Sequence, residues 1–328
     1  MNADIEKLNL QAEKFSENLR EVIGEVSKVI VGQDDLIRKT IITLMSNGHA
    51  LLEGVPGLAK TLLISTLSEC ISSSFNRIQF TPDLLPADIT GIKIYNHETQ
   101  GFVTKKGPVF ANLILADEIN RAPPKVQSAL LEAMQEREVT IYGESFKLKS
   151  PFFVLATQNP IESEGTYKLP EAEVDRFMFK LVVTYPSFDD SKEIIRRMTK
   201  RFIYVPKKVI GVSKILEIQS FVKNVYCDES IVNYVVTLVD ATRNPKKYGI
   251  DINHFIDYGA SPRALLSLTV GAKAVAVLFG RGYVTSDDVR FIAHDVLRHR
   301  IILSYEAEAE GIKADQIVDM ILDKVEVP

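Results

Sequence analysis

Cysteine is scarce in this sequence, and an excess of positive charge is absent. The 328 residues include two cysteines, Cys70 and Cys227, which lie far apart and have no metal-binding spacing. We therefore expect reduced, structural thiols in a cytosolic protein. The formal net charge of −4 provides no global basic field that would hold nucleic acid or anionic lipid.

Long apolar segments are also missing. Residues 1–27 carry acidic side chains throughout and lack the apolar stretch of a signal peptide. The most apolar predicted helix, LLSLTVGAKAVAVLFG, is interrupted by Lys273 and is too short to span a bilayer. We expect no membrane insertion and a cytoplasmic location.

The order of the predicted elements indicates an α/β domain followed by a helical one. An amphipathic helix is predicted over residues 4–30. Apolar strands then alternate with helices, which is typical of a parallel sheet. The five predicted strands cover residues 49–52, 75–81, 113–116, 152–159 and 177–183. Hairpins are predicted over residues 92–104 and 137–148. We place the domain boundary so that residues 1–186 form the α/β core and residues 187–328 a small all-helical domain.

The segment GVPGLAKT, from Gly54 to Thr61, has the features of a phosphate-binding loop. It follows a buried strand and opens a helix, which is the context such a loop requires. Gly54 and Gly57 allow the backbone N–H groups to turn around a phosphate. Lys60 adds a positive charge and Thr61 a hydroxyl for magnesium. The alternative is a glycine-rich turn that binds nothing.

Further candidates surround this loop. Asp117 and Glu118 end an apolar strand, where Asp117 can hold magnesium and Glu118 can polarise the attacking water. The alternative is a solvated acidic strand end. Ile30 and Val31 either pack on an adenine base or belong to the core. The predicted nucleotide contacts are Ile30, Val31, Gly54, Val55, Pro56, Gly57, Leu58, Ala59, Lys60, Thr61 and Leu62.

Three polar residues complete the candidate site. Asn159 ends a strand and can orient the water, or it is a turn residue before proline. Arg263 falls in the first turn of a helix that Ser261 can cap, where a cation opposes the helix dipole and a phosphate would suit both. The alternative for Arg263 is a surface arginine. Arg176 lies among acidic residues that can simply pair with it, so its chemistry alone does not make it catalytic.

Five motifs occur together in a fixed order. They are GVPGLAKT, LILADEINRAPPKVQSALLEAMQE, ATQNP, LPEAEVDRF and GASPRA. In this combination the sequence resembles the MoxR family of AAA+ ATPases, from residue 31 to the last predicted helices. Ala59 replaces the glycine of the common loop pattern, and the family tolerates this variant.

The resemblance implies a role for each motif. Gly54–Thr61 would be Walker A, Asp117 and Glu118 Walker B, and Asn159 sensor 1. Arg176 would be the arginine finger and Arg263 sensor 2 on the helical lid. The hairpins would face a ring's pore or a partner.

The resemblance also implies a function. It predicts a magnesium-dependent ATPase that forms a homo-oligomeric ring, expected to be a hexamer. Its clients would be protein complexes that it remodels or matures, with von Willebrand A-domain proteins among the candidates. Two other functions stay open, namely a nucleic-acid motor and a nucleotide-gated scaffold with little turnover. The acidic balance weighs against the first of these.

Overall fold

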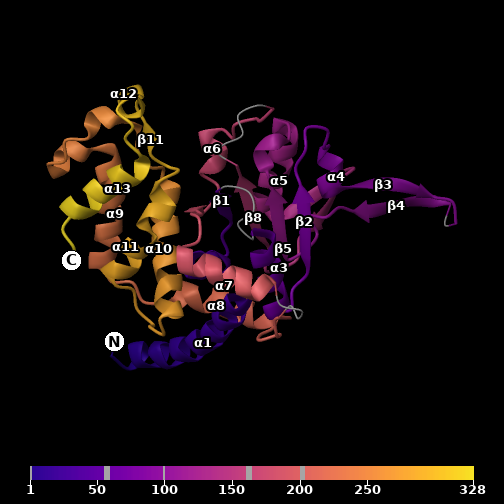
Figure 1. Ribbon diagram of the computed structural model, residues 1–328, viewed down its shortest axis with the longest axis horizontal. Coiled ribbons are helices and arrows are strands. Elements are labelled where there is room, and N and C mark those ends of the chain that lie inside the picture. The colour runs from indigo at the N-terminus through magenta and orange to yellow at the C-terminus, as the bar shows by residue number, and fades with distance from the viewer. Residues whose placement is uncertain (1, 55–59, 99, 160–164, 200–203) are drawn as a thin grey trace.

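The computed structural model describes the chain except for residues 1, 55–59, 99, 160–164 and 200–203 (Figure 1). In this described part, five parallel strands form the central sheet in the order β2-β5-β8-β1-β9. Their bounds are β1 (Ala50–Glu53), β2 (Phe75–Gln79), β5 (Leu113–Asp117), β8 (Phe153–Gln158) and β9 (Phe179–Val182). The five predicted strands and the parallel sheet are confirmed.

The three central strands of this sheet, β5, β8 and β1, bury side chains on both faces. Leu113 and Leu115 of β5 belong to one apolar core, whereas Ile114 and Ala116 belong to another on the opposite face. Because successive side chains of a strand alternate between faces, an uninterrupted apolar run needs cover on both sides. The first core is covered by helices including α1 (Asn2–Val29), α2 (Asp34–Met45) and α3 (Lys60–Cys70), and the second by α4 (Pro86–Thr90) and α5 (Pro124–Glu136).

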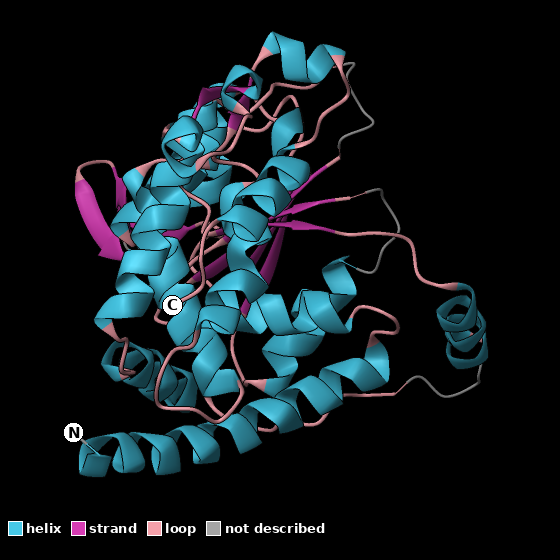
Figure 2. Ribbon diagram, turned by 90° about the vertical axis from the view of Figure 1, so that its left-hand side faces the viewer, coloured by secondary structure: helices cyan, strands magenta, loops and turns pink. Residues whose placement is uncertain are grey.

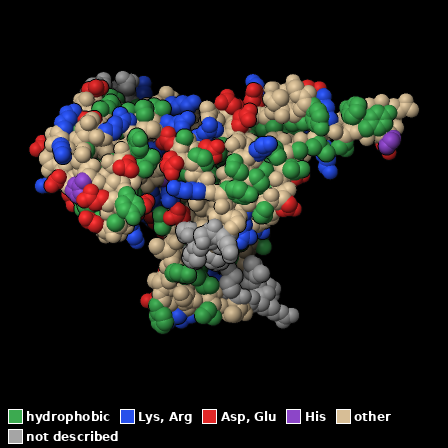
Figure 3. Space-filling view, turned by 90° about the horizontal axis from the view of Figure 1, so that it is seen from above, with side chains coloured by type: hydrophobic (Ala, Val, Ile, Leu, Met, Phe, Trp, Pro, Cys, Tyr) green, Lys and Arg blue, Asp and Glu red, His purple; other side chains and the backbone are tan. Residues whose placement is uncertain are grey.

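Two antiparallel hairpins interrupt the α/β order, as predicted. One pairs β3 (Gly91–Asn96) with β4 (Gly101–Lys106), and the other pairs β6 (Glu138–Ile141) with β7 (Glu144–Lys147). The β3–β4 hairpin projects from the body of the molecule (Figure 1). Hydrophobic side chains gather along it (Figure 3), and Phe102 near its tip is 73% exposed.

The second half of the chain is mostly helical. Its helices are α7 (Phe188–Met198), α8 (Val212–Asn224), α9 (Glu229–Arg243), α10 (Pro262–Leu278), α11 (Ser286–Leu297), α12 (Tyr305–Ala309) and α13 (Ala314–Lys324). The predicted division after residue 186 falls between β9 and α7. The long α1 runs along one side of the molecule (Figure 2) and packs against α10 as well as α3. The first apolar core therefore continues from the sheet into these helices.

One detail of the helical half differs from the prediction. A short antiparallel ladder joins β10 (Ile256–Tyr258) to β11 (Ile302–Leu303), so this half is not all helical. The ladder pairs segments that are 40 or more residues apart, and a strand of two or three residues leaves no periodic pattern to detect. Within the described residues, no helix combines the length and apolar character needed to cross a membrane.

Candidate active site

Most of the predicted site residues meet at one edge of the sheet. Gly54 follows β1, Asp117 ends β5, and Asn159 follows β8. These three strands are neighbours in the order β5-β8-β1. Because parallel strands end at the same edge, the sheet brings together residues that are 42 or more positions apart in the sequence. This carboxyl edge is where α/β proteins bind ligands.

The phosphate-binding loop is described only at its two ends, since Val55, Pro56, Gly57, Leu58 and Ala59 lie outside the described residues. At the far end, Lys60 begins α3 and its ammonium group donates a 2.6 Å hydrogen bond to the Gly54 carbonyl. Burial lowers the pKa of Lys60, and the charges of Asp117 and Glu118 oppose this shift. Thr61 and Leu62 follow in the first turn of α3, where both are half-buried.

Thr157, near the end of β8, joins the two acidic residues. Its hydroxyl donates a 2.6 Å hydrogen bond to Asp117 Oδ1 and accepts one of 2.8 Å from the Glu118 backbone N–H. Glu118 has a φ of 58°, in the left-handed region that is costly for a residue with a side chain. The Thr157 hydroxyl therefore holds both the Asp117 carboxylate and the strained backbone that aims Glu118.

Side chains from β2 and the turn after β5 complete the surroundings of the acidic pair. Arg77 donates to Asp117 Oδ2 at 2.5 and 3.1 Å. Gln79 donates a 2.9 Å hydrogen bond to Glu118 Oε2, and Arg121 pairs with the same oxygen at 3.2 Å. The two carboxylates thus avoid mutual repulsion because each has its own cationic or amide partner.

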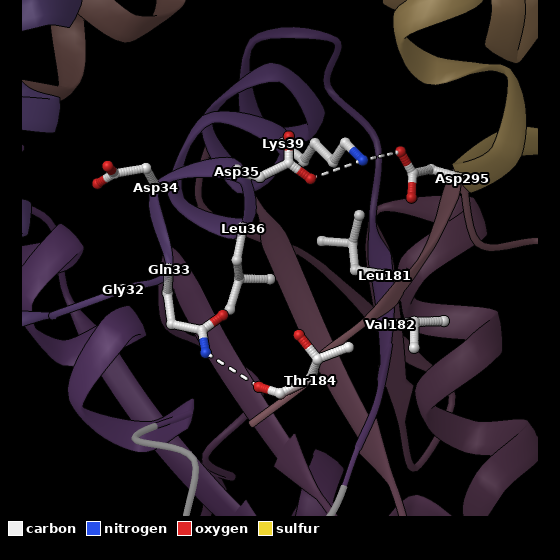
Figure 4. Close-up of a pocket in the computed structure, with 10 residues that line it drawn as sticks. All are labelled: Gly32, Gln33, Asp34, Asp35, Leu36, Lys39, Leu181, Val182, Thr184 and Asp295. Carbon is white, nitrogen blue, oxygen red and sulfur yellow. Dashed lines mark hydrogen bonds and ion pairs between the residues drawn. The ribbon is translucent and has the colours of Figure 1, made fainter. Parts of the chain in front are cut away.

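The remaining nucleotide contacts are placed around this edge. Asn159 is 7% exposed, next to β1 in the sheet. Ile30 is 4% exposed and belongs to the first apolar core, whereas Val31 is half-buried. A pocket of about 150 Å³ lies just beyond Val31 (Figure 4), lined by Gly32, Gln33, Asp34, Asp35, Leu36, Lys39, Leu181, Val182, Thr184 and Asp295.

This pocket adjoins the phosphate-binding loop through the end of β9. A Cβ on Gly54 would lie 3.0 Å from Val183, the residue between two that line the pocket. Figure 4 shows Gln33 donating to the Thr184 carbonyl at 3.3 Å, and Lys39 between two carboxylates, at 2.8 Å from Asp35 and 2.7 Å from Asp295. The hollow next to the loop is therefore polar.

Arg176 and Arg263 do not join the other candidates. Arg176 precedes β9, and Met178 pairs with His49 at the start of β1 through a 2.8 Å backbone hydrogen bond. The two arginines instead line a separate pocket of about 220 Å³ that also includes Ser46 and Gly48. These residues lie at the amino edge of the sheet, separated from the loop by the four residues of β1. At ~3.3 Å per residue, that is roughly 13 Å.

The local predictions for Arg263 are confirmed, but its partner was not foreseen. The Ser261 hydroxyl accepts a 3.2 Å hydrogen bond from the Arg263 backbone N–H, and Pro262 begins α10. The Arg263 guanidinium lies 3.2 Å from a carboxylate oxygen of Asp175.

The exposed Arg176 side chain makes no hydrogen bond or ion pair among the described residues. The acidic residues near Arg176 in the sequence have other partners. Glu171 pairs with Lys168, and Asp175 pairs with Arg263 and Arg300.

Several residues that contact the predicted site residues had no role predicted from the sequence. They are Arg77, Gln79, Arg121, Thr157, Asp175 and Arg300. The one sequence signal for Arg77, Gln79 and Thr157 is that they are polar residues near the ends of the apolar strands β2 and β8. That signal helps only once the strand order is known.

Known proteins match the chain over most of its length. The model of the ATPase family associated with various cellular activities (AAA) matches residues 49–179, and an AAA lid domain matches residues 251–321. Chaperone MoxR1 of Mycobacterium tuberculosis is 48% identical over 94% of this chain and 82% of its own length. The chain belongs to the MoxR family of AAA+ ATPases.

Another member of the MoxR family and a solved structure agree with this placement. Protein MoxR of Methylorubrum extorquens is 30% identical over 89% of this chain and 90% of its own length. A crystal structure of a candidate ATPase from Cytophaga hutchinsonii is 49% identical, covers 99% of this chain and 98% of its own, and superimposes with a TM-score of 0.92. The chain is therefore an AAA+ ATPase with an α/β core and a lid domain.

Proposed function

We propose that this MoxR-type ATPase hydrolyses magnesium-bound ATP at subunit interfaces of a homo-oligomeric ring, and that it uses the cycle to remodel or mature client proteins in the cytoplasm. One observation carries the proposal. The loop and the acidic pair lie at the carboxyl edge of the sheet, whereas the two predicted catalytic arginines lie together at the amino edge. A complete site then requires two subunits.

The carboxyl edge supplies the groups that bind the nucleotide. The Lys60 ammonium is placed for the β- and γ-phosphates once it leaves the Gly54 carbonyl. The Thr61 hydroxyl and the Asp117 carboxylate are hard oxygen donors that suit Mg²⁺, an ion that keeps several waters and takes few protein ligands. When bound, the ion neutralises charge that develops on the phosphates. Ile30 and Val31 would flank the adenine beside the polar pocket.

Glu118 and Asn159 act on the attacking water. The Glu118 carboxylate, held by Gln79 and Arg121, polarises the water, and the Asn159 amide orients it toward the γ-phosphate. The γ-phosphate then transfers to that water by an in-line displacement. Most of the acceleration comes from positioning and charge, because the protein makes no covalent bond in this reaction.

Arg176 and Arg263 act on the nucleotide of the next subunit. An arginine at the amino edge would need to cross the roughly 13 Å length of β1 to reach its own loop. A neighbour whose carboxyl edge faces this pocket would receive both side chains at its phosphates. Repeating this heterologous contact closes a ring, for which we expect six subunits.

The clients are proteins, with von Willebrand A-domain proteins as candidates. Support comes from Chaperone MoxR1 among the relatives and from the projecting β3–β4 hairpin, on which Tyr95 is 48% and Phe102 73% exposed. Such apolar exposure on a projecting element is typical of a contact surface.

A first experiment tests the nucleotide site. Lys60→Ala removes the charge that faces the phosphates, so we expect ATP binding to be lost in a calorimetric titration. Glu118→Gln keeps the side-chain volume and the Gln79 contact, so it should bind ATP with near-normal affinity while its kcat falls by roughly a hundredfold or more. Full turnover by Glu118→Gln would refute the assignment of the acidic pair.

A second experiment tests the shared site. Arg176→Ala and Lys60→Ala subunits should each be inactive alone, yet mixing them should restore ATPase activity where an intact loop meets an intact arginine. Co-purification of the two variants carrying different affinity tags verifies that mixed rings form, and analytical ultracentrifugation reports their size. No recovery in verified mixed rings would exclude action of Arg176 on a neighbour's nucleotide.

A further inference from the structure

The Asp175 carboxylate, directly before Arg176 in the chain, joins the core to the lid. It accepts hydrogen bonds of 2.9 and 3.0 Å from the Ser261 hydroxyl and pairs with Arg263 at 3.2 Å. The Arg300 guanidinium donates a 2.8 Å hydrogen bond to Asp175 Oδ1, the carboxylate oxygen that Arg263 does not contact. The Asp175 side chain is 15% exposed, so these charged contacts are largely shielded from water.

Arg300 connects the same carboxylate to the backbone around Arg176. Its side chain is 1% exposed and donates to the carbonyls of Asp175 at 3.2 Å, Phe177 at 2.7 Å and Met178 at 3.1 Å. Burial lowers the pKa of Arg300 to about 10, and Asp175 opposes that shift. Arg300 therefore stays charged at neutral pH, and Asp175 is the carboxylate that offsets this buried charge.

Asp175 also controls where α10 begins. Ser261, which donates to Asp175, is the residue that caps α10, and Arg263 lies in the first turn of this helix. The carboxylate thus contacts the cap of α10, the guanidinium of Arg263 and the arginine that holds the backbone on both sides of Arg176. The positions of Arg176 and Arg263 depend on one acidic group.

We propose that Asp175 is a positioning residue, which holds Arg176 and Arg263 as one rigid unit for the nucleotide of the neighbouring subunit. This inference rests on the proposed function, because it assumes that both arginines act across the subunit interface. Asp175 itself does not touch the nucleotide. Its effect should appear in the turnover of the neighbour's site and leave ATP binding by its own subunit unchanged.

Asp175→Asn is the direct test. The amide keeps the shape but loses the charge that holds Arg263 and Arg300, so kcat should fall roughly ten- to a hundredfold, the range for loss of a hydrogen bond to a charged group. The KM for ATP should stay within about twofold, since Lys60 and the loop are untouched. Glu171→Gln is the matched control, because Glu171 lies four residues away and pairs with Lys168 instead. This control should leave kcat unchanged.

Mixed rings distinguish positioning from a general folding defect. Asp175→Asn mixed with Lys60→Ala should regain activity, because the first supplies an intact loop and the second an intact arginine pair. Asp175→Asn mixed with Arg176→Ala should not recover, since both are defective on the same face. A misfolded subunit would fail in both mixtures.

A second variant keeps the proposal testable if Asp175→Asn does not fold. Asp175→Glu preserves the charge that Arg300 requires but displaces the carboxylate by one methylene group. It should remain folded and still show a lower kcat.

The outcomes separate this inference from the function it rests on. If Arg176→Ala and Lys60→Ala complement each other but a folded Asp175→Asn and Lys60→Ala do not, the positioning role is wrong and the shared site stands. Normal kcat in Asp175→Asn, or in Asp175→Glu where that is the folded variant, also overturns the positioning role. If Arg176→Ala and Lys60→Ala fail to complement in verified mixed rings, the shared site and this inference are both overturned.

Discussion

Thr157→Val removes a single hydroxyl from beneath the acidic pair and keeps the shape of the side chain. The threonine is 1% exposed, and its hydroxyl contacts both Asp117 and the Glu118 backbone. Because valine has nearly the same volume, the change opens no cavity. Any effect then comes from the two lost hydrogen bonds.

The magnitude follows from the nature of these two bonds. A hydrogen bond to a charged group contributes about 1.5–3 kcal/mol to stability, which covers the loss at Asp117. The Glu118 N–H is left without its acceptor, at a cost of about 1–3 kcal/mol. Glu118 has a φ of 58° and no longer has the contact that supports it there. We expect the free energy of unfolding to fall by roughly 2.5–6 kcal/mol.

Two measurements check this expectation. Thermal unfolding should show a midpoint lowered by at least about 3 °C. The ATPase kcat should fall roughly tenfold or more, because Glu118 and Asp117 no longer hold their relative positions. Thr157→Ser is the matched control, since it retains the hydroxyl and should preserve most of the activity.

One result would refute this reasoning. If Thr157→Val keeps both its unfolding midpoint and its kcat while Thr157→Ser behaves like the parent protein, the hydroxyl does not organise the acidic pair. Loss of stability with unchanged kcat would restrict Thr157 to a structural role.

Three further predictions concern other parts of the molecule. Burial lowers the pKa of His49 to about 3. As the pH falls below about 6.5, this histidine is therefore protonated in the unfolded chain but stays neutral in the folded one. The free energy of unfolding should drop by about 2 kcal/mol between pH 7 and pH 5 for this reason. His49→Gln should reduce that drop in denaturant titrations, and an unchanged pH dependence would contradict it. Gly91→Ala should raise the rate of hydrogen exchange across the β3–β4 hairpin. The new Cβ would lie 2.3 Å from the Lys105 carbonyl, on a residue whose φ is +108°. Gly143→Ala is the control, because open space surrounds this position, and it should have a smaller effect on the β6–β7 hairpin. DNA or RNA near physiological salt should bind weakly and leave the ATPase rate unchanged, and stimulation would favour a nucleic-acid motor.

The strands, both hairpins and the capped start of α10 could be predicted because their signals are local. Apolar runs bounded by turn residues marked the five strands of the sheet, and Ser261-Pro262 marked the beginning of a helix. The β10–β11 ladder was missed because its strands are too short for such a pattern.

The candidate site was predictable where chemistry coincides with a strand end. Gly54, Asp117 and Asn159 each lie at the end of a predicted strand or within two residues after it, so a parallel sheet had to gather them at one edge. The partners of the acidic pair were not predictable in this way. Arg77 and Thr157 lie 40 positions before and after Asp117, and only the strand order β2-β5-β8 places them on either side of it.

The sequence alone therefore predicted an ATPase, through the pattern of a phosphate-binding loop and polar residues at the ends of apolar strands. The tertiary structure decided which of these residues lie together. It separated Arg176 and Arg263 from the loop by the length of β1, and it joined Arg263 and Arg300 to Asp175 across 88 and 125 positions of the chain. Periodicity and local motifs describe neighbours along the chain, whereas these contacts depend on how the lid packs against the sheet.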